Sequence, residues 1–156
     1  QEIRPNPDLD PFSSAIGAHV TYYLGGESQI GFSYADFEQE KSRPERKQIA
    51  GVDFLWSRDR VELSGEAIYR SSGFGGAYDE RGAFVQLVVP LSQKLYGVGR
   101  WESFRLAGDS ATTRLWVGGL NYRIRPSIVL KAEWIEAHHD TEEAPDGFLA
   151  SISVLL

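Results

Sequence analysis

The sequence ends with Gly147-Phe148-Leu149-Ala150-Ser151-Ile152-Ser153-Val154-Leu155-Leu156, in which a two-residue alternation runs to the last position. One face of this stretch is apolar throughout and comprises Phe148, Ala150, Ile152, Val154 and Leu156. The opposite face carries Ser151 and Ser153. A period of two predicts a β-strand, and an apolar face opposite a polar one suits a membrane barrel around a wet interior.

The same alternation recurs along the chain and predicts nine strands, at 16–24, 29–34, 50–56, 61–70, 83–89, 95–102, 116–124, 128–134 and 148–156. We therefore predict an all-β fold, an antiparallel up-and-down transmembrane β-barrel in which residues 15–156 form the strands. The proline-rich residues 1–14 are predicted to be an extracellular loop or extended segment.

Composition agrees with a membrane barrel but also with one soluble domain. Hydrophobic residues make up 42%, and no apolar run approaches the roughly 20 residues that a membrane-spanning helix needs. If the chain spans a bilayer, it must use strands of about 9–11 residues. The net charge of -6 argues against a nucleic-acid partner, because no basic run is long enough to neutralise several phosphates. The chain has no Cys, which excludes disulfides.

The charged residues indicate which face would line the interior. A cation on the lipid face at mid-bilayer costs about 2–4 kcal/mol, so rows that hold cations must face a lumen. The predicted lumen-lining residues are Asp53, Glu62, Glu66, Arg70, Arg100, Glu102, Arg123, Lys131 and Glu133. Their mixed signs predict a nearly balanced wall, and we expect most of these charges to pair across adjacent strands.

The opposite rows end in aromatic residues, which favour the interfaces of a bilayer. The predicted lipid-facing aromatic girdle comprises Tyr22, Tyr34, Trp56, Tyr69, Trp101, Tyr122 and Trp134.

The connections between predicted strands alternate strictly between short and long. Short links lie at 25–27, 57–59, 92–94 and 125–127, and long polar links lie at 38–47, 71–82, 103–113 and 136–147. Bacterial outer-membrane barrels have short periplasmic turns and long extracellular loops. This layout places the start of the first strand outside, although a complete barrel has an even strand number and a periplasmic start. The missing strands are expected from an amino-terminal piece or a partner chain, unless one segment is miscounted and eight strands close alone.

Six short motifs in this order resemble the carboxyl-terminal half of phosphate-selective-type and related outer-membrane porins. They are GVDFLW at 51–56, LSGEA at 63–67, LYGVGRWE at 95–102, GLNYR at 119–123, VLKAEW at 129–134 and GFLAS at 147–151. The resemblance covers roughly residues 49–156. It implies a bacterial outer-membrane barrel, surrounded by lipid, that lets small hydrophilic solutes or ions diffuse passively. A homotrimer is one assembly compatible with such a barrel.

Other classes of function remain as alternatives. A non-conducting barrel could act as a scaffold or sheath for a partner protein, or be a small plugged eight-stranded barrel. A soluble lipocalin-like barrel would need the aromatic rows inside. Glu62 and Glu66 have no accompanying catalytic motif, so we predict no enzyme. The acidic and His-containing stretch 138–143 suits a polar loop better than a metal site, and we predict no metal and no cofactor.

Overall fold

The computed structural model describes residues 12–39, 45–73, 75–76, 79–138 and 146–154. They form a single nine-stranded antiparallel sheet in which each strand pairs with the next along the chain. The strands are β1 (Phe12–Gly25), β2 (Ser28–Gln39), β3 (Glu45–Arg58), β4 (Val61–Ser72), β5 (Glu80–Pro90), β6 (Leu95–Arg105), β7 (Thr113–Arg125), β8 (Ile128–His138) and β9 (Gly147–Val154). The predicted all-β, up-and-down order of nine strands is confirmed.

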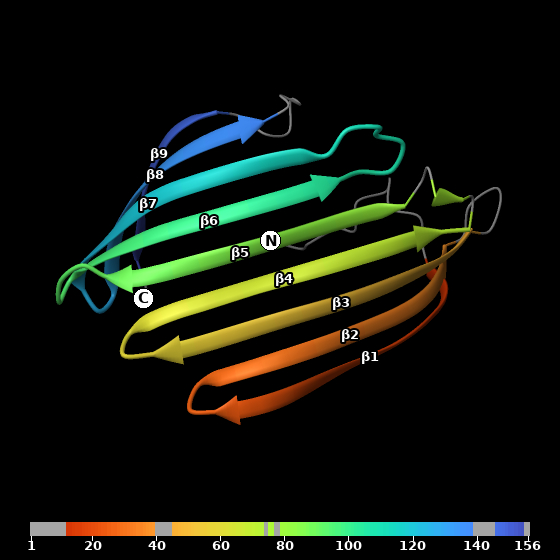
Figure 1. Ribbon diagram of the computed structural model, residues 1–156, viewed down its shortest axis with the longest axis horizontal. Coiled ribbons are helices and arrows are strands. Elements are labelled where there is room, and N and C mark those ends of the chain that lie inside the picture. Colours follow the sequence, from red (N-terminus) through yellow and green to blue (C-terminus); the bar gives the residue numbers. More distant parts are fainter. Residues whose placement is uncertain (1–11, 40–44, 74, 77–78, 139–145, 155–156) are drawn as a thin grey trace, which may run out of the picture.

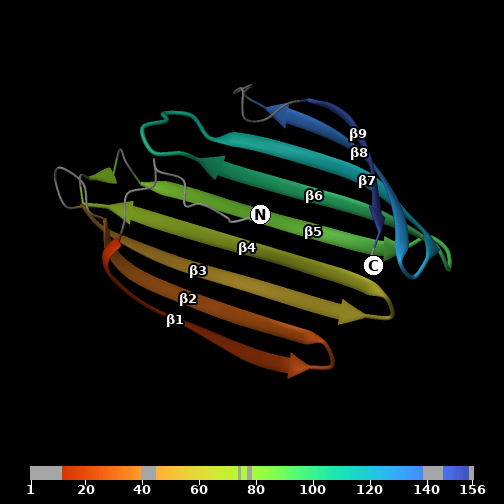
Figure 2. The same ribbon diagram turned by 180° about the vertical axis from the view of Figure 1, so that it is seen from behind.

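The strand ends that flank the short connections lie together at one end of the sheet, and those that flank the long connections lie at the other, as Figures 1 and 2 show from opposite sides. Among the described residues there is no helix long and apolar enough to cross a membrane.

Several strands extend beyond the predicted boundaries. β1 begins at Phe12 rather than after residue 14, and β3 begins at Glu45 within the predicted loop 38–47. The ladder continues there because polar side chains support it: Arg46 Nε donates to Asp36 Oδ1 at 2.8 Å across β2 and β3. Apolar alternation therefore located the strands but underestimated their length. Residues 1–11 and Leu156 lie outside the described residues.

The turn between β3 and β4 is a tight one without glycine. Asp59 and Arg60 both have positive φ angles, 53° and 68°. Two consecutive residues in this region match a type I′ turn, whose twist suits a β-hairpin but which usually contains Asn or Gly. Arg60 has compensating contacts, because its Nη2 donates to Ser92 O, Gln93 O and Tyr96 Oη at 3.3, 3.3 and 2.6 Å. These bonds join this turn to the turn between β5 and β6.

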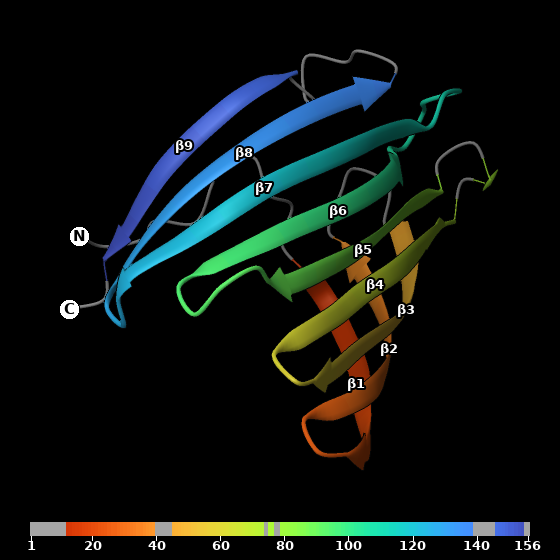
Figure 3. The ribbon, with the colours of Figure 1, turned by 60° about the vertical axis from the view of Figure 1, so that its left-hand side comes forward.

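The sheet bends into an open trough, which Figure 3 shows from the side. Within the described part of the chain, β1 pairs only with β2 and β9 only with β8. These residues therefore do not form a closed barrel of nine strands. The alternative of eight strands that close alone is wrong as well, because the described residues form nine strands and the edge strands β1 and β9 do not pair.

This sheet encloses almost no hydrophobic core. Phe37, which is 9% exposed, is the one buried hydrophobic residue in the described part of the chain. Many large apolar side chains are instead exposed, including Ile16 at 74% and Trp134 at 59%. A monomer in water rarely exposes a contiguous apolar surface of this kind.

Gly65 provides a test of packing on the sheet surface. It lies opposite Phe54, and a Cβ there would be 2.5 Å from Phe54 Cε1 and 2.8 Å from the carbonyl oxygen of Phe84. We predict that Gly65→Ala destabilises the fold by about 1–3 kcal/mol through overpacking. Gly99→Ala, on the same face with nothing within 4 Å, should be neutral or stabilising by up to about 1 kcal/mol. Urea titration of both variants in lipid vesicles measures the difference, and equal stabilities would contradict this packing.

Candidate lumenal face

The strand register sorts side chains onto two faces, because directly opposite residues of antiparallel strands project to the same side. Asp53 opposes Glu66, Glu66 opposes Phe84, and Phe84 opposes Glu102. We call this side the polar face. All the predicted lumen-lining residues lie on it: Asp53, Glu62, Glu66, Arg70, Arg100, Glu102, Arg123, Lys131 and Glu133.

The other side, the apolar face, carries the predicted girdle and the described apolar residues of the final strand. These are Tyr22, Tyr34, Trp56, Tyr69, Trp101, Tyr122, Trp134, Phe148, Ala150, Ile152 and Val154. Trp101 and Trp134 lie further from the strand ends than predicted, because β6 and β8 continue past them to Arg105 and His138. Trp116, which the girdle prediction omitted, contacts Trp101 with ring centroids 6.5 Å apart.

The polar face is the more crowded of the two. Along β7, Trp116, Gly118 and Leu120 are exposed, whereas the alternate residues Val117 and Gly119 are half-buried. In a bent sheet, side chains converge on the concave side and spread apart on the convex side, so we assign the polar face to the inside of the trough. A lipocalin-like barrel would require the opposite arrangement, with the aromatic rows inside.

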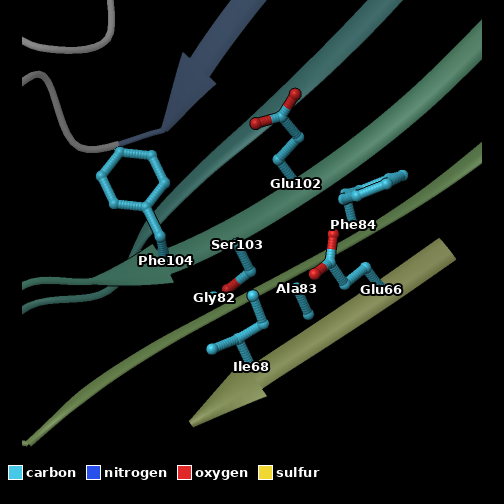
Figure 4. A pocket seen from close by; sticks show the side chains of 8 residues that line it. All are labelled: Glu66, Ile68, Gly82, Ala83, Phe84, Glu102, Ser103 and Phe104. Atoms are coloured by element: carbon cyan, nitrogen blue, oxygen red, sulfur yellow. The ribbon is translucent and has the colours of Figure 1, made fainter. Parts of the chain in front are cut away.

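Acidic residues and an aromatic ring occupy the middle of the polar face. A hollow of about 200 Å³ lies there, and Figure 4 shows Glu66 and Glu102 among its lining residues, on either side of Phe84. The guanidinium of Arg100 lies 4.1 Å from the centroid of the Phe84 ring and pairs with Glu102 at 2.5 Å. Asp53 and Glu66, directly opposite each other, form no ion pair with any described residue. Like charges in this position repel each other. Because no described cation pairs with these two acids, the electrostatic potential around them is negative.

The expected pairing of charges across strands is found in one place on the polar face. Arg70 on β4 pairs with Glu80, its direct neighbour on β5. Arg100 and Glu102 instead pair along a single strand. Among the described residues, Glu62, Arg123, Lys131 and Glu133 join no ion pair, so the polar face carries more free charge than predicted.

Asp79 fastens the connection between β4 and β5 at the long-loop end. It accepts hydrogen bonds from the Tyr69 hydroxyl and, at 3.0 Å, from the backbone N–H of Ser72. These bonds, the one from Tyr69 above all, hold the pKa of the Asp79 carboxyl below its usual value. A lowered pKa means that the anchor is fully present above the pKa of a free aspartate, and is lost as the pH falls through the lower folded value.

The described residues hold no group of three or more His, Asp or Glu side chains arranged for a metal ion. His138, at the end of β8, is exposed. The remaining residues of the stretch 138–143 lie outside the described part of the chain.

Comparison of the chain with protein-family models, with curated proteins and with solved structures found no match. The resemblance to outer-membrane porins therefore stays a prediction that rests on the six quoted motifs.

Sequence reasoning missed four residues of the polar face and its rim: Arg60, Phe84, Tyr96 and Asn121. Phe84 and Tyr96 are aromatic residues on rows that are otherwise mostly polar. This break in the alternation is the sequence signal that could have singled them out. Arg60 lies in a turn and reaches Tyr96 only because the turns of two hairpins are neighbours in space.

The assignment of faces predicts how single arginines are tolerated in a bilayer. Leu130→Arg places a cation on the apolar face and should cost about 2–4 kcal/mol or prevent insertion. Ser151→Arg, on the polar face of the neighbouring strand, should be tolerated by comparison. A folding titration in lipid vesicles ranks the two variants. The reverse ranking would mean that the inside and outside of the trough are exchanged.

Proposed function

We propose that the sheet is part of the wall of a porin-like barrel in a bacterial outer membrane, through which small hydrophilic solutes or ions diffuse passively. The observation that carries the proposal is the pairing of a coreless sheet with an apolar convex face whose charged residues lie only toward the strand ends. Lipid hydrocarbon can cover such a face, and the polar concave face with its free charges then suits a water-filled lumen. With lipid on one face and water on the other, the sheet needs no hydrophobic protein core.

The two edges of the sheet support completion by further strands. β1 and β9 contain no Asp, Glu, Lys or Arg, whereas each of the strands between them contains at least one. Free edges are normally protected by charged residues, proline or bulges, since unpaired backbone groups invite pairing. In a membrane, each unpaired backbone group would also cost several kcal/mol. We therefore propose that additional strands, from the same chain or another, pair with both edges.

The direction of the strands limits how the gap can close. Because nine is odd, β1 and β9 run in the same direction, and pairing them with each other would be parallel. Pairing the edge strands of two copies inserted in the same orientation would be parallel as well. An antiparallel barrel thus requires an odd number of additional strands.

One observation favours the alternative of a non-conducting sheath. Tyr23, Ile68 and Leu149 lie on the polar face yet are 71%, 41% and 55% exposed. Such side chains would suit contact with a protein segment held inside the barrel. A sheath would need detergent but would not conduct.

The pore itself is tested with the native protein, extracted in detergent and reconstituted in planar bilayers. It should form ion-conducting pores, and a monodisperse monomer without detergent would contradict membrane insertion. The double variant Arg100→Gln, Lys131→Gln should shift the reversal potential toward cations, because two lumenal positive charges are removed. Arg114→Gln, on the apolar-face side at the long-loop end, is the matched control and should leave it unchanged. An unchanged reversal potential in the double variant would show that Arg100 and Lys131 do not line the lumen.

Completion of the sheet is tested by cross-linking, which is simple because the chain has no Cys. Val20→Cys is combined in turn with Cys at the apolar-face positions of β9, namely Phe148, Ala150, Ile152 and Val154. None of these pairs should cross-link within one molecule of the native protein. Leu130→Cys with Ile152→Cys, which lie directly opposite, should cross-link readily with a short thiol reagent. Efficient joining of β1 to β9 would show that nine strands close alone.

A further inference from the structure

Two arginines lie directly opposite each other on the apolar face, toward the long-loop end of the sheet. Arg81 on β5 is the register partner of Arg105 on β6, and Arg81 also opposes Tyr69 of the aromatic girdle. Arg81 is exposed and Arg105 is half-buried. Arg105 ends β6 on the same face as Trp101, and it lies closer to the long connection. If the apolar face contacts lipid, both arginines lie at the depth of the headgroups, beyond the tryptophans.

The described residues neutralise this pair of arginines only in part. Like charges that face each other directly across two strands repel. Neither arginine forms an ion pair with a described residue. The hydrogen bond from Tyr69 is the main cause of the lowered pKa of Asp79, and the positive charge of Arg105 lowers this pKa further. Asp79 is therefore close enough to Arg105 to interact with it, but its two oxygens already accept hydrogen bonds from Tyr69 and Ser72.

The pair keeps hydrogen-bond donors available for a ligand. Arg81 donates through Nη2 to the Thr112 hydroxyl at 3.3 Å. The Nε atom of Arg105 is buried and has no hydrogen-bond partner among the described residues. A buried donor without a partner destabilises a fold unless a ligand accepts a hydrogen bond from it. The two side chains thus present N–H groups and positive charge to an anion that contacts both strands.

Neighbouring charges on the apolar face do not enlarge the pair into a wider basic patch. Arg114 on β7 is a diagonal neighbour of Arg105, but it is also a diagonal neighbour of Glu136 on β8. The Glu136 carboxylate offsets the charge of Arg114. Further along the sheet, Arg46 pairs with Asp36 at 2.8 Å. The uncompensated positive charge therefore belongs to the arginines of β5 and β6.

We propose that Arg81 and Arg105 form a binding site for the phosphate group of an anionic lipid, at the long-loop end of the apolar face. A phosphate between them accepts hydrogen bonds from both guanidinium groups and removes their mutual repulsion. On the same face of β5, toward the middle of the sheet, Val85 and Leu87 are 41% and 42% exposed. An acyl chain attached to the phosphate covers these two side chains, whereas a free phosphate ion does not. This inference rests on the membrane insertion of the proposed function but not on conduction.

The test uses tryptophan fluorescence, because all four Trp residues lie on the apolar face. Trp56→Phe with Trp134→Phe leaves Trp101 and Trp116 as reporters on β6 and β7, deeper in the bilayer than the arginines. This protein is reconstituted in vesicles that mix phosphatidylglycerol and phosphatidylcholine, with dibrominated acyl chains on either lipid to quench nearby tryptophans. Quenching as a function of composition gives the binding constant of phosphatidylglycerol relative to phosphatidylcholine.

We expect phosphatidylglycerol to be preferred about fivefold, the effect of one arginine at an anionic membrane surface. The preference should fall toward unity in Arg81→Gln, and Arg81→Lys should recover part of it. Arg58→Gln is the matched control, because Arg58 lies on the same face at the short-turn end and pairs with Asp59 at 3.5 Å. This variant should keep the preference of the unsubstituted arginines.

Four results would overturn the site. A ratio of one without an arginine substitution would show no preference, and an equal fall in Arg81→Gln and Arg58→Gln would indicate general interfacial charge. Loss of the preference on adding inorganic phosphate at fixed ionic strength would show that the arginines bind the free ion instead of a lipid. No quenching by either brominated lipid would reject membrane insertion, and with it the proposed function. Equal quenching by both lipids would reject the lipid site alone.

Discussion

The exposed apolar face is the constraint on which the rest of the structure depends. A sheet of nine strands whose described residues bury one hydrophobic side chain gains little of the usual driving force for folding in water. Its backbone ladder is satisfied between strands, but the convex side chains need apolar surroundings to contribute. In the proposed membrane setting, hydrocarbon provides them, and it also forbids unpaired backbone at the edges. The two demands, a covered face and paired edges, both lead to a closed wall.

The polar face shows how bending a sheet concentrates charge. Residues of one register row, such as Asp53, Glu66 and Glu102, converge on the concave side, and Phe84 separates the last two. The cations Arg123 and Lys131 lie nearer the short turns on β7 and β8. A count of charges treats this wall as balanced, yet the unpaired acids Asp53 and Glu66 lie together on β3 and β4, away from the unpaired Arg123 and Lys131 on β7 and β8. The local electrostatic potential, rather than the net charge, then determines how a charged solute interacts with each part of the wall.

The strands and their faces could be predicted from the sequence because a period of two fixes which side each residue occupies. A shift of one residue would have exposed Lys131 on the apolar face, so the face of that strand was clear, whereas residues 83–89 are apolar on both faces and left their orientation open. Strand ends were predicted less well, since the ladder continues through polar residues such as Arg46 and Asp36. The contact of Arg60 with Tyr96 joins two hairpins, and no local spacing encodes it. Curvature was likewise invisible, because it arises from the twist summed over all the strands.

The unpaired acids Asp53 and Glu66 bear on what lies opposite the polar face. Asp53 and Glu66 lie opposite each other on β3 and β4 without a described cation between them, although Arg70 and Arg100 lie on the same face. Those two arginines are already engaged by Glu80 and Glu102. In a closed barrel, the concave face looks across the lumen toward the strands that complete the wall. Water and dissolved cations in that lumen can screen the acidic pair, whereas a dry or tightly packed interior would penalise it by several kcal/mol. The acidic pair therefore favours a hydrated interior facing the middle of this sheet.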